Sequence, residues 1–270
     1  MKTRILGAAA LAVAGATAAQ AAPINVAVIG GGSNSASDVA SQLNDDTHFD
    51  FTAAVISVSD AESLSTLQAF DAVVLGDSGY GDNGWSAGMF ASLRQYLDWG
   101  GGIVTAGWYS YATDLISGQS AADADYITPI ADGSYSHAYD ATLTNLVDHA
   151  ITSGVSSVSG SGCCFEVAPG GVDAGAVSLG TINGQVAAAY QDVIGRSVYL
   201  GGLYMADDGS TTYRAAVTAL RSGEGDRLLE QAVAWAAEGT VSPVPLPASL
   251  SLSFAGLALL GVAGRRRKAA

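Results

Sequence analysis

The fold is decided by two apolar runs, Asp71-Ala-Val-Val-Leu-Gly76 and Gly100-Gly-Gly-Ile-Val-Thr-Ala-Gly107. Short runs that are rich in β-branched residues and bounded by glycine are typical of buried parallel strands. Between them, large apolar residues recur at helical spacing: Trp85, Met89, Phe90, Leu93, Tyr96 and Leu97. A strand, a helix and a strand within about forty residues predict a right-handed crossover in a parallel sheet covered by helices. Ligands bind such sheets beyond the carboxyl ends of the strands, so we expect a site at residues 76–80 and 107–111.

The same patterns extend over most of the chain. Further strands are expected at residues 24–29, 51–56, 165–167, 176–182, 185–191 and 195–200, and helices near residues 37–43, 63–69 and 226–237. Asn183-Gly184 between apolar alternations predicts a β-hairpin. Residues 110–139 contain few aliphatic runs and are expected to be an insertion, and residues 143–150 a helical turn. The predicted fold class is therefore α/β, with a doubly wound, mostly parallel sheet and a β-hairpin-rich C-terminal half.

The first 21 residues have the three parts of a secretory signal peptide. Lys2 and Arg4 precede an apolar run over residues 5–19, and Ala19-Gln-Ala21 fits a small-x-small cleavage site. The sequence thus predicts Sec-type export, with cleavage by signal peptidase after Ala21. The folded domain is expected to span residues 22–240.

Residues 241–270 carry a second sorting pattern. A proline-rich motif precedes an uncharged apolar segment over residues 248–264, and a basic cluster follows at once. The residues of this motif and cluster are Val244, Pro245, Leu246, Pro247, Ala248, Arg265, Arg266 and Arg267. The order of motif, segment and arginines resembles the VPLPA variety of the PEP-CTERM sorting signal. The resemblance implies a transient transmembrane anchor, removal by an exosortase-like protease, and a final place at the cell surface or in an extracellular matrix. An ordinary tail anchor is the alternative.

The charge of the expected domain excludes one class of partner. All 25 acidic residues lie between the two sorting segments, which hold six of the 11 basic residues, so five Arg remain and the domain carries a formal charge of −20. Nucleic acid is therefore not an expected partner. We predict no cofactor and no metal site, because His48, His137 and His149 are widely spaced. Ca²⁺ at the acidic turns near Asp77 or Asp207 is the alternative.

Several segments of the domain resemble the class I glutamine amidotransferase-like fold, which is flavodoxin-like, and its ThuA-like relatives. The resemblance is carried by residues 70–75, 93–102, 149–154, 195–202 and 228–235. It implies a nucleophilic Cys on the turn after the strand near Gly107 and a His-x-Glu pair after the strand near Leu200. The sequence has Ala106-Gly-Trp-Tyr-Ser110 and Gly201-Gly-Leu-Tyr-Met205 there, so neither half of the chemistry is present.

No catalytic residue is therefore assigned, and the candidates are ligand-binding residues at the strand ends: Asp77, Tyr80, Trp108, Tyr109, Ser110, His149, Tyr204 and Asp207. Together with Trp85 and Tyr111, the aromatic candidates offer rings that could stack on sugars, or they serve as packing. The adjacent Cys163 and Cys164 are candidates for a disulfide, either a rigid loop clip or a redox-active bond, with an intermolecular link as a third reading.

Two functions follow from these observations. The first is an exported, envelope-sorted and non-catalytic amidotransferase-like domain, a binding or structural protein associated with the cell surface or with exopolysaccharide. The alternative is an extracytoplasmic hydrolase or isomerase that acts on a saccharide through Asp77, Asp207 and His149, with Ser110 as a nucleophile only if a base lies beside it.

Overall fold

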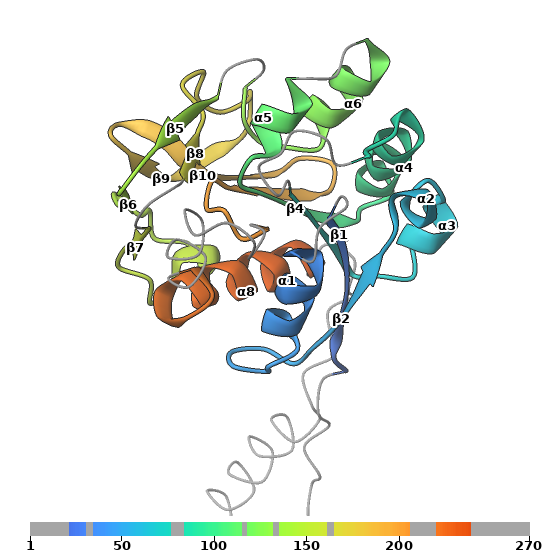
Figure 1. Ribbon diagram of the computed structural model, residues 1–270, viewed down its shortest axis with the longest axis horizontal. Helices are drawn as coiled ribbons and strands as arrows, with labels where there is room; N and C mark the ends of the chain where they lie inside the picture. The colour runs from blue at the N-terminus through green and yellow to red at the C-terminus, as the bar shows by residue number, and fades with distance from the viewer. Residues whose placement is uncertain are drawn as a thin grey trace, which may run out of the picture. The chain divides into compact units, whose positions relative to one another are not determined.

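The computed structural model describes residues 22–30, 35–76, 84–114, 118–131, 135–160, 165–205 and 220–238. Residues Pro23–Ser242 form one compact unit. Its centre is a seven-stranded sheet in the order β2-β1-β3-β4-β11-β10-β9 (Figure 1). The strands are β1 (Ile24–Gly30), β2 (Phe51–Ile56), β3 (Ala72–Gly76), β4 (Gly102–Ala106), β9 (Val177–Ile182), β10 (Gln185–Asp192) and β11 (Arg196–Leu200).

The sheet is mostly parallel. β2, β1, β3, β4 and β11 run in one direction, whereas β10 is antiparallel to both of its neighbours. The register places Gly30 beside Gly76 and Leu200 beside Ala106, so the carboxyl ends of β1, β3, β4 and β11 share one edge. This arrangement confirms the doubly wound α/β prediction and its two central strands.

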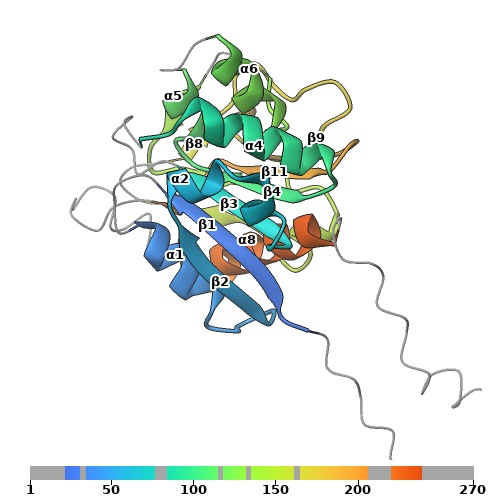
Figure 2. The same ribbon diagram turned by 90° about the vertical axis from the view of Figure 1, so that its right-hand side faces the viewer.

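Helices cover both faces of the sheet. α1 (Ser35–Leu43) and α8 (Gly223–Ala237) lie on one face, and α2 (Val58–Ala61), α3 (Leu64–Leu67) and α4 (Ala87–Asp98) lie on the other (Figure 2). Alternate strand residues supply the two cores: Val73 and Ile103 pack toward α4, and Val74 and Val104 pack toward α8. Because both faces are covered, β3 and β4 are buried along their whole length, which explains their unbroken apolar runs.

Helix α4 forms as the apolar periodicity predicts. The Ser86 hydroxyl accepts a hydrogen bond from the Met89 amide and caps the first turn. The helix buries Met89, Phe90, Leu93, Tyr96 and Leu97, and the Tyr96 hydroxyl donates to the Phe70 carbonyl oxygen at 3.0 Å. That last contact fixes the helix to the chain segment that enters β3.

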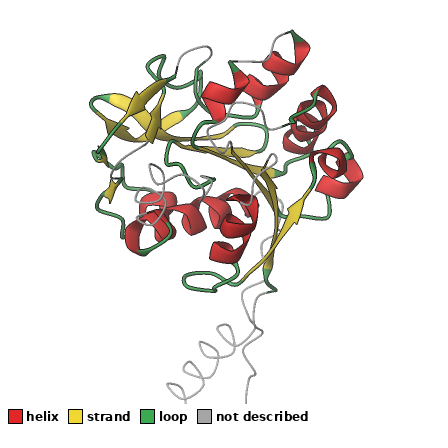
Figure 3. Cartoon of the chain, viewed as in Figure 1, coloured by secondary structure: helices red, strands yellow, loops and turns green. Residues whose placement is uncertain are grey.

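The C-terminal half contains the predicted hairpin. β9 and β10 are joined at Asn183 and Gly184, both with positive φ, as a tight two-residue turn requires. Two small sheets lie outside the main one (Figure 3): β5 (Ser136–Ala138) pairs with β8 (Phe165–Val167), and β6 (Thr142–Leu143) pairs with β7 (Val158–Ser159). The expected strand at residues 165–167 therefore exists but leaves the main sheet.

One local expectation was incomplete and another was wrong. The insertion over residues 110–139 contains α5 (Tyr109–Thr113) and α6 (Gln119–Tyr126), which are held by tertiary contacts. Arg94 of α4 pairs with Asp123 at 2.9 Å and lies over the Tyr126 ring at 4.3 Å. The helical turn expected at residues 143–150 lies later in the chain, as the 3-10 turn η1 (Ala150–Thr152).

Within the described ranges, no helix is both long and apolar enough to cross a membrane. The two sorting segments, residues 1–21 and 241–270, lie outside those ranges, and so does the apolar segment 248–264.

We expect Gly102→Ala to lower the free energy of unfolding by about 1–3 kcal/mol. A Cβ at Gly102 would overlap the carbonyl oxygen of Ala236, so α8 would have to move away from β4. The matched control is Gly88→Ala on the exposed start of α4, where a Cβ meets only the flexible Glu62 side chain. Ala is the better helix former, so the control should change stability by no more than about 1 kcal/mol. Equal losses in urea unfolding of the two variants would contradict this packing of α8.

Candidate functional site

The turn from β4 into α5 has the geometry of a site that presents a side chain above the sheet. The strand ends at Ala106, Gly107 follows, and α5 starts at Tyr109. Trp108 between them has φ 64° and ψ 10°, in the left-handed region. The other described non-glycine residues with positive φ are Asp46, Asp140, Asn145 and Asn183. Asp and Asn tolerate this conformation, whereas a bulky Trp is strained in it, so the surrounding contacts must hold the turn.

A close approach between the backbones of Gly107 and Gly202 holds this turn. The Gly107 amide donates to the Gly202 carbonyl oxygen at 2.9 Å, just beyond the carboxyl end of β11. A Cβ at Gly107 would lie 2.6 Å from that same oxygen. Only glycine therefore fits, and the turns after β4 and β11 are locked together.

The Trp108 side chain packs inward, with only 5% of the residue exposed. Its ring meets the His137 ring edge-on, with 4.0 Å between the ring centres, and the Tyr111 ring at 5.5 Å. Trp108 therefore serves at this turn to pack the interior. Its indole Nε1 and the Nε2 of His137 are buried, and neither has a hydrogen-bond partner among the described residues.

A buried carboxylate occupies the start of α5. Glu166 of β8 accepts hydrogen bonds from the amides of Ser110 at 3.1 Å and Tyr111 at 2.8 Å. The Tyr199 hydroxyl of β11 donates to it at 2.9 Å. Gly201 lets β8 approach this closely, because a Cβ there would overlap the Glu166 carbonyl oxygen. The first amides of a helix bind anions, and here the chain supplies its own anion.

Burial raises the pKa of Glu166 to about 7, although the amides of Tyr111 and Ser110, the Tyr199 hydroxyl and the Ser110 side chain all favour the charged form. Burial, followed by the nearby Glu166, also raises the pKa of the Tyr199 hydroxyl well above its usual value. Near neutral pH, Glu166 is therefore close to its titration midpoint while Tyr199 keeps its proton.

Tyr109 and Tyr204 are two candidates that the structure buries. The Tyr109 hydroxyl donates to the Ala124 carbonyl oxygen at 2.7 Å, and the Tyr204 hydroxyl donates to the Gly225 carbonyl oxygen at 2.8 Å. Burial raises the pKa of both hydroxyls. Each residue is 1% exposed, so neither ring can stack on a sugar, and these two expectations are corrected to packing roles.

His149 lies away from the strand ends. Its Nδ1 accepts from the Ile151 amide and caps η1, and its ring stacks on Tyr190 at 4.2 Å and meets Trp235 at 5.4 Å. The Arg196 guanidinium lies over the Trp235 ring at 4.6 Å. In the strand register, Arg196 of β11 lies opposite Gly102 at the amino end of β4. The ring of His149 therefore packs against β10 and α8, and its ring contacts are with Tyr190 and Trp235 rather than with Trp108. Burial and Arg196 lower its pKa.

The remaining expected site residues lie outside the described ranges. They are Asp77, Tyr80, Asp207, Cys163, Cys164, Val244, Pro245, Leu246, Pro247, Ala248, Arg265, Arg266 and Arg267. Of the expected set, the structure brings together Trp108, Tyr109 and Ser110, because they are neighbours in the chain.

A group of aromatic rings adjoins Trp108, and it combines Tyr111, which the sequence analysis named as a stacking candidate, with rings that it did not connect to this site. We call Tyr111, Tyr135, His137 and Tyr139 the aromatic cluster. Tyr111 and Tyr135 meet edge-on at 5.1 Å, and Tyr135 stacks on His137 at 5.4 Å. Tyr139 is 61% exposed and lies 6.3 Å from His137. The available signal was the alternation of residues 135, 137 and 139 in and beside β5, which places their side chains on one face of the strand.

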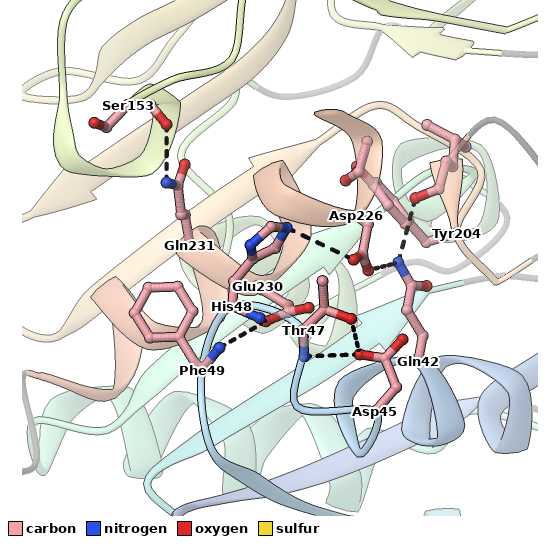
Figure 4. A network of polar contacts seen from close by, with 12 residues as sticks. Gln42, Asp45, Thr47, His48, Phe49, Ser153, Tyr204, Asp226, Glu230 and Gln231 are labelled. Carbon is pink, nitrogen blue, oxygen red and sulfur yellow. Dashed lines mark hydrogen bonds and ion pairs between the residues drawn. The ribbon is translucent and has the colours of Figure 1, made fainter. Parts of the chain in front are cut away.

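A second polar group, also missed by the sequence analysis, lies at α8. His48, Asp226 and Glu230 converge there, and their nitrogen and oxygen atoms lie within 4.8 Å of one another (Figure 4). Burial raises the pKa of Asp226, and burial together with Asp226 raises that of Glu230 to about 7. The spacing of Asp226 and Glu230, one helical turn apart on the buried side of α8, was the available signal.

Solved structures share this fold at low sequence identity. A cytoplasmic protein from Salmonella typhimurium matches with a TM-score of 0.57 and 13% identity, over 79% of this chain and 99% of its own. A protein described as ThuA-like from Bacteroides uniformis matches with a TM-score of 0.52 and 11% identity, over 82% and 95%. A protein described as a GMP synthase subunit from Thermoplasma acidophilum matches with a TM-score of 0.51 and 11% identity, over 81% and 96%. The sequence matches no protein-family model, and comparison with curated proteins gives no match.

These likenesses establish the fold. They agree with the resemblance to ThuA-like and glutamine amidotransferase-like proteins that the sequence suggested.

We expect Glu166→Gln to remove a pH dependence of stability. In the unfolded chain Glu166 loses its proton near pH 4.5, whereas in the fold it keeps the proton up to about pH 7. The folded state therefore binds more protons in this window, and stability falls as pH rises through it, by about 3 kcal/mol at about 1.4 kcal/mol per pH unit.

Urea unfolding of both proteins at pH 4.5, 6 and 8 measures this difference. Other titrating groups contribute equally to the two proteins, so the gap between them isolates Glu166. Parallel curves for the two proteins would show that Glu166 does not hold its proton in the fold.

Proposed function

We propose that this chain is an exported, surface-sorted protein whose amidotransferase-like domain binds saccharide and does not hydrolyse glutamine. The observation that carries the proposal is the occupant of the turn after β4. A nucleophile at this turn must be exposed above the sheet, beside amides that are free to stabilise an oxyanion. Trp108 fills the position with a buried ring, and Glu166 holds the amides of Ser110 and Tyr111.

The residues after β11, where the resemblance implies the second catalytic group, support the same conclusion. Where the resemblance implies His-x-Glu after β11, the chain has Tyr204 and Met205, and both are buried. A Cβ at Gly76 would lie 2.6 Å from the Met205 side chain, so this methionine lies against the end of β3. An apolar side chain there cannot move a proton.

The aromatic cluster is the binding surface we propose. Partly exposed tyrosine rings offer faces on which the apolar side of a sugar ring stacks. The buried Trp108 Nε1 and His137 Nε2 lie beside them without described partners, and sugar hydroxyls both donate and accept hydrogen bonds. With a formal charge of −14 for the chain, a neutral saccharide suits this surface better than an acidic one.

Export and surface sorting rest on the two terminal segments. The signal-peptide pattern at residues 1–21 and the VPLPA motif with its apolar segment and arginines at residues 241–270 support transit through the Sec machinery and later processing. A protein that is sorted to the surface and binds saccharide there would associate with exopolysaccharide.

An extracytoplasmic hydrolase is the second candidate, favoured by one contact. The Ser110 side chain lies near enough to Glu166, a carboxylate with a pKa near 7, to favour its charged form, so a hydroxyl and a proton acceptor do lie together. Against this role, the Glu166 oxygens already accept from two amides and Tyr199. The ring of His149, which the alternative hypothesis also used, contacts Tyr190 and Trp235 instead. Hydrolysis of any ester or glycoside that Ser110→Ala abolishes would establish the enzyme and refute our proposal.

We expect the purified domain to bind a neutral oligosaccharide from a glycan panel, and Tyr111→Ala and Tyr139→Ala each to weaken binding about three- to tenfold, since each removes one stacking face. Trp99→Ala is the matched control, because Trp99 is 53% exposed at the end of α4, outside the aromatic cluster. Titration calorimetry measures the affinities. Absence of binding across the panel, or equal losses in all three variants, would refute the binding surface.

Intact mass and cell fractionation test the export part separately. We expect the native protein to start at Ala22, to lack the segment after the VPLPA motif, and to be found outside the inner membrane. Recovery of the full 270-residue chain from the cytoplasm would contradict this part of the proposal.

A further inference from the structure

Three side chains from two distant parts of the chain meet beside α8, outside the site discussed above. His48 belongs to the loop between α1 and β2, and Asp226 and Glu230 lie one turn apart on α8. One ligand atom from each residue lies within 4.8 Å of the other two (Figure 4). The His48 Nε2 and the Asp226 Oδ2 are 3.9 Å apart.

Donors elsewhere in the chain bind one oxygen of each carboxylate, and the two carboxyl groups also contact each other. The Gln42 side chain donates from Nε2 to Asp226 Oδ1 at 2.7 Å. The amides of His48 and Phe49 both donate to Glu230 Oε2 at 3.0 Å. Such contacts orient a carboxylate for monodentate binding, as the outer hydrogen bonds of metal ligands do.

Both carboxylates are buried. Glu230 has no exposed surface, and its Oε1 is without a hydrogen-bond partner among the described residues. A buried polar atom in that state is costly, and one oxygen of the same carboxylate lies within 4.8 Å of ligand atoms of Asp226 and His48. Two neighbouring carboxylates and a ring nitrogen form a donor set that a cation would satisfy and that hydrophobic packing does not explain.

We propose that His48, Asp226 and Glu230 bind one divalent transition-metal ion of the Zn²⁺ class. An imidazole nitrogen with two carboxylate oxygens suits Zn²⁺, whereas Ca²⁺ and Mg²⁺ prefer oxygen ligands alone. Two ligands of one tetrahedral Zn²⁺ lie about 3.4 Å apart, so side-chain rotations must bring the three atoms, now within 4.8 Å of one another, closer together. Water reaches the ion past His48, whose side chain is 22% exposed.

The ion would join the loop that ends at β2 to the first turns of α8, two segments more than 170 residues apart in the chain. The expectation of no metal site came from the spacing of the histidines alone, and it overlooked carboxylates brought in by the fold. The site is separate from the saccharide proposal, because His48, Asp226 and Glu230 come from the α1–β2 loop and α8 and none of them belongs to the aromatic cluster.

The test uses the full chain, freed of metal with a chelator and dialysed. Titration calorimetry with ZnCl₂, and separately with CaCl₂, measures the stoichiometry and the dissociation constant. We expect one Zn²⁺ per chain and binding of Ca²⁺ at least tenfold weaker. His48→Gln and Glu230→Gln should each weaken Zn²⁺ binding at least tenfold.

Glu224→Gln is the matched control. It removes an acid from the same helix, and Glu224 contacts Ser156 and Ser157 instead of the proposed ligands. Its affinity for Zn²⁺ should equal that of the parent. Circular dichroism shows whether each variant is folded, and the partly exposed position of His48 keeps His48→Gln informative if Glu230→Gln unfolds.

Three results would overturn the proposal. The first is no Zn²⁺ binding by the folded parent, which would leave Asp226 and Glu230 as a pair that shares a proton. The second is unchanged affinity in folded His48→Gln. The third is an equal loss of affinity in Glu224→Gln, which would indicate diffuse binding to an acidic surface.

Discussion

A carboxylate from a small outer sheet binds the first amides of α5, the helix that follows β4, and the start of that helix depends on this contact. Glu166 joins β8 to α5 and, through Tyr199, to β11. The contact requires Gly201, where two backbones approach too closely for any side chain. It also stabilises the strained turn at Trp108, because the amides that follow this turn are satisfied inside the protein.

The same contact supports the proposal that the domain lacks the chemistry that the amidotransferase resemblance implies. A helix that starts after a parallel strand can offer its amides to a substrate or to the protein itself. In this chain they are taken by Glu166, and an indole stands where a thiol would be needed. The result is a scaffold in which the turn after β4 serves packing, with partly exposed tyrosines beside it.

Local patterns predicted the parts of the structure that local patterns determine. β3, α4 and β4 follow directly from apolar runs, helical spacing and glycine, and Asn183-Gly184 specified its hairpin. α6 was missed because its stability comes from Arg94, which contacts Asp123 and Tyr126 from another helix. The role of Glu166 was missed because the amides that it binds lie 55 and 56 positions earlier in the chain. Such pairings depend on the finished topology, so no short stretch of the sequence reveals them.

Carbon-13 NMR of the Glu166 carboxyl group, assigned with Glu166→Gln, tests the central claim most directly. The account predicts a titration midpoint near pH 7, with the amide signals of Ser110 and Tyr111 following the same curve. A midpoint near 4.5, with amide signals that do not respond, would show that the carboxylate is solvated and that the helix start is open to a ligand.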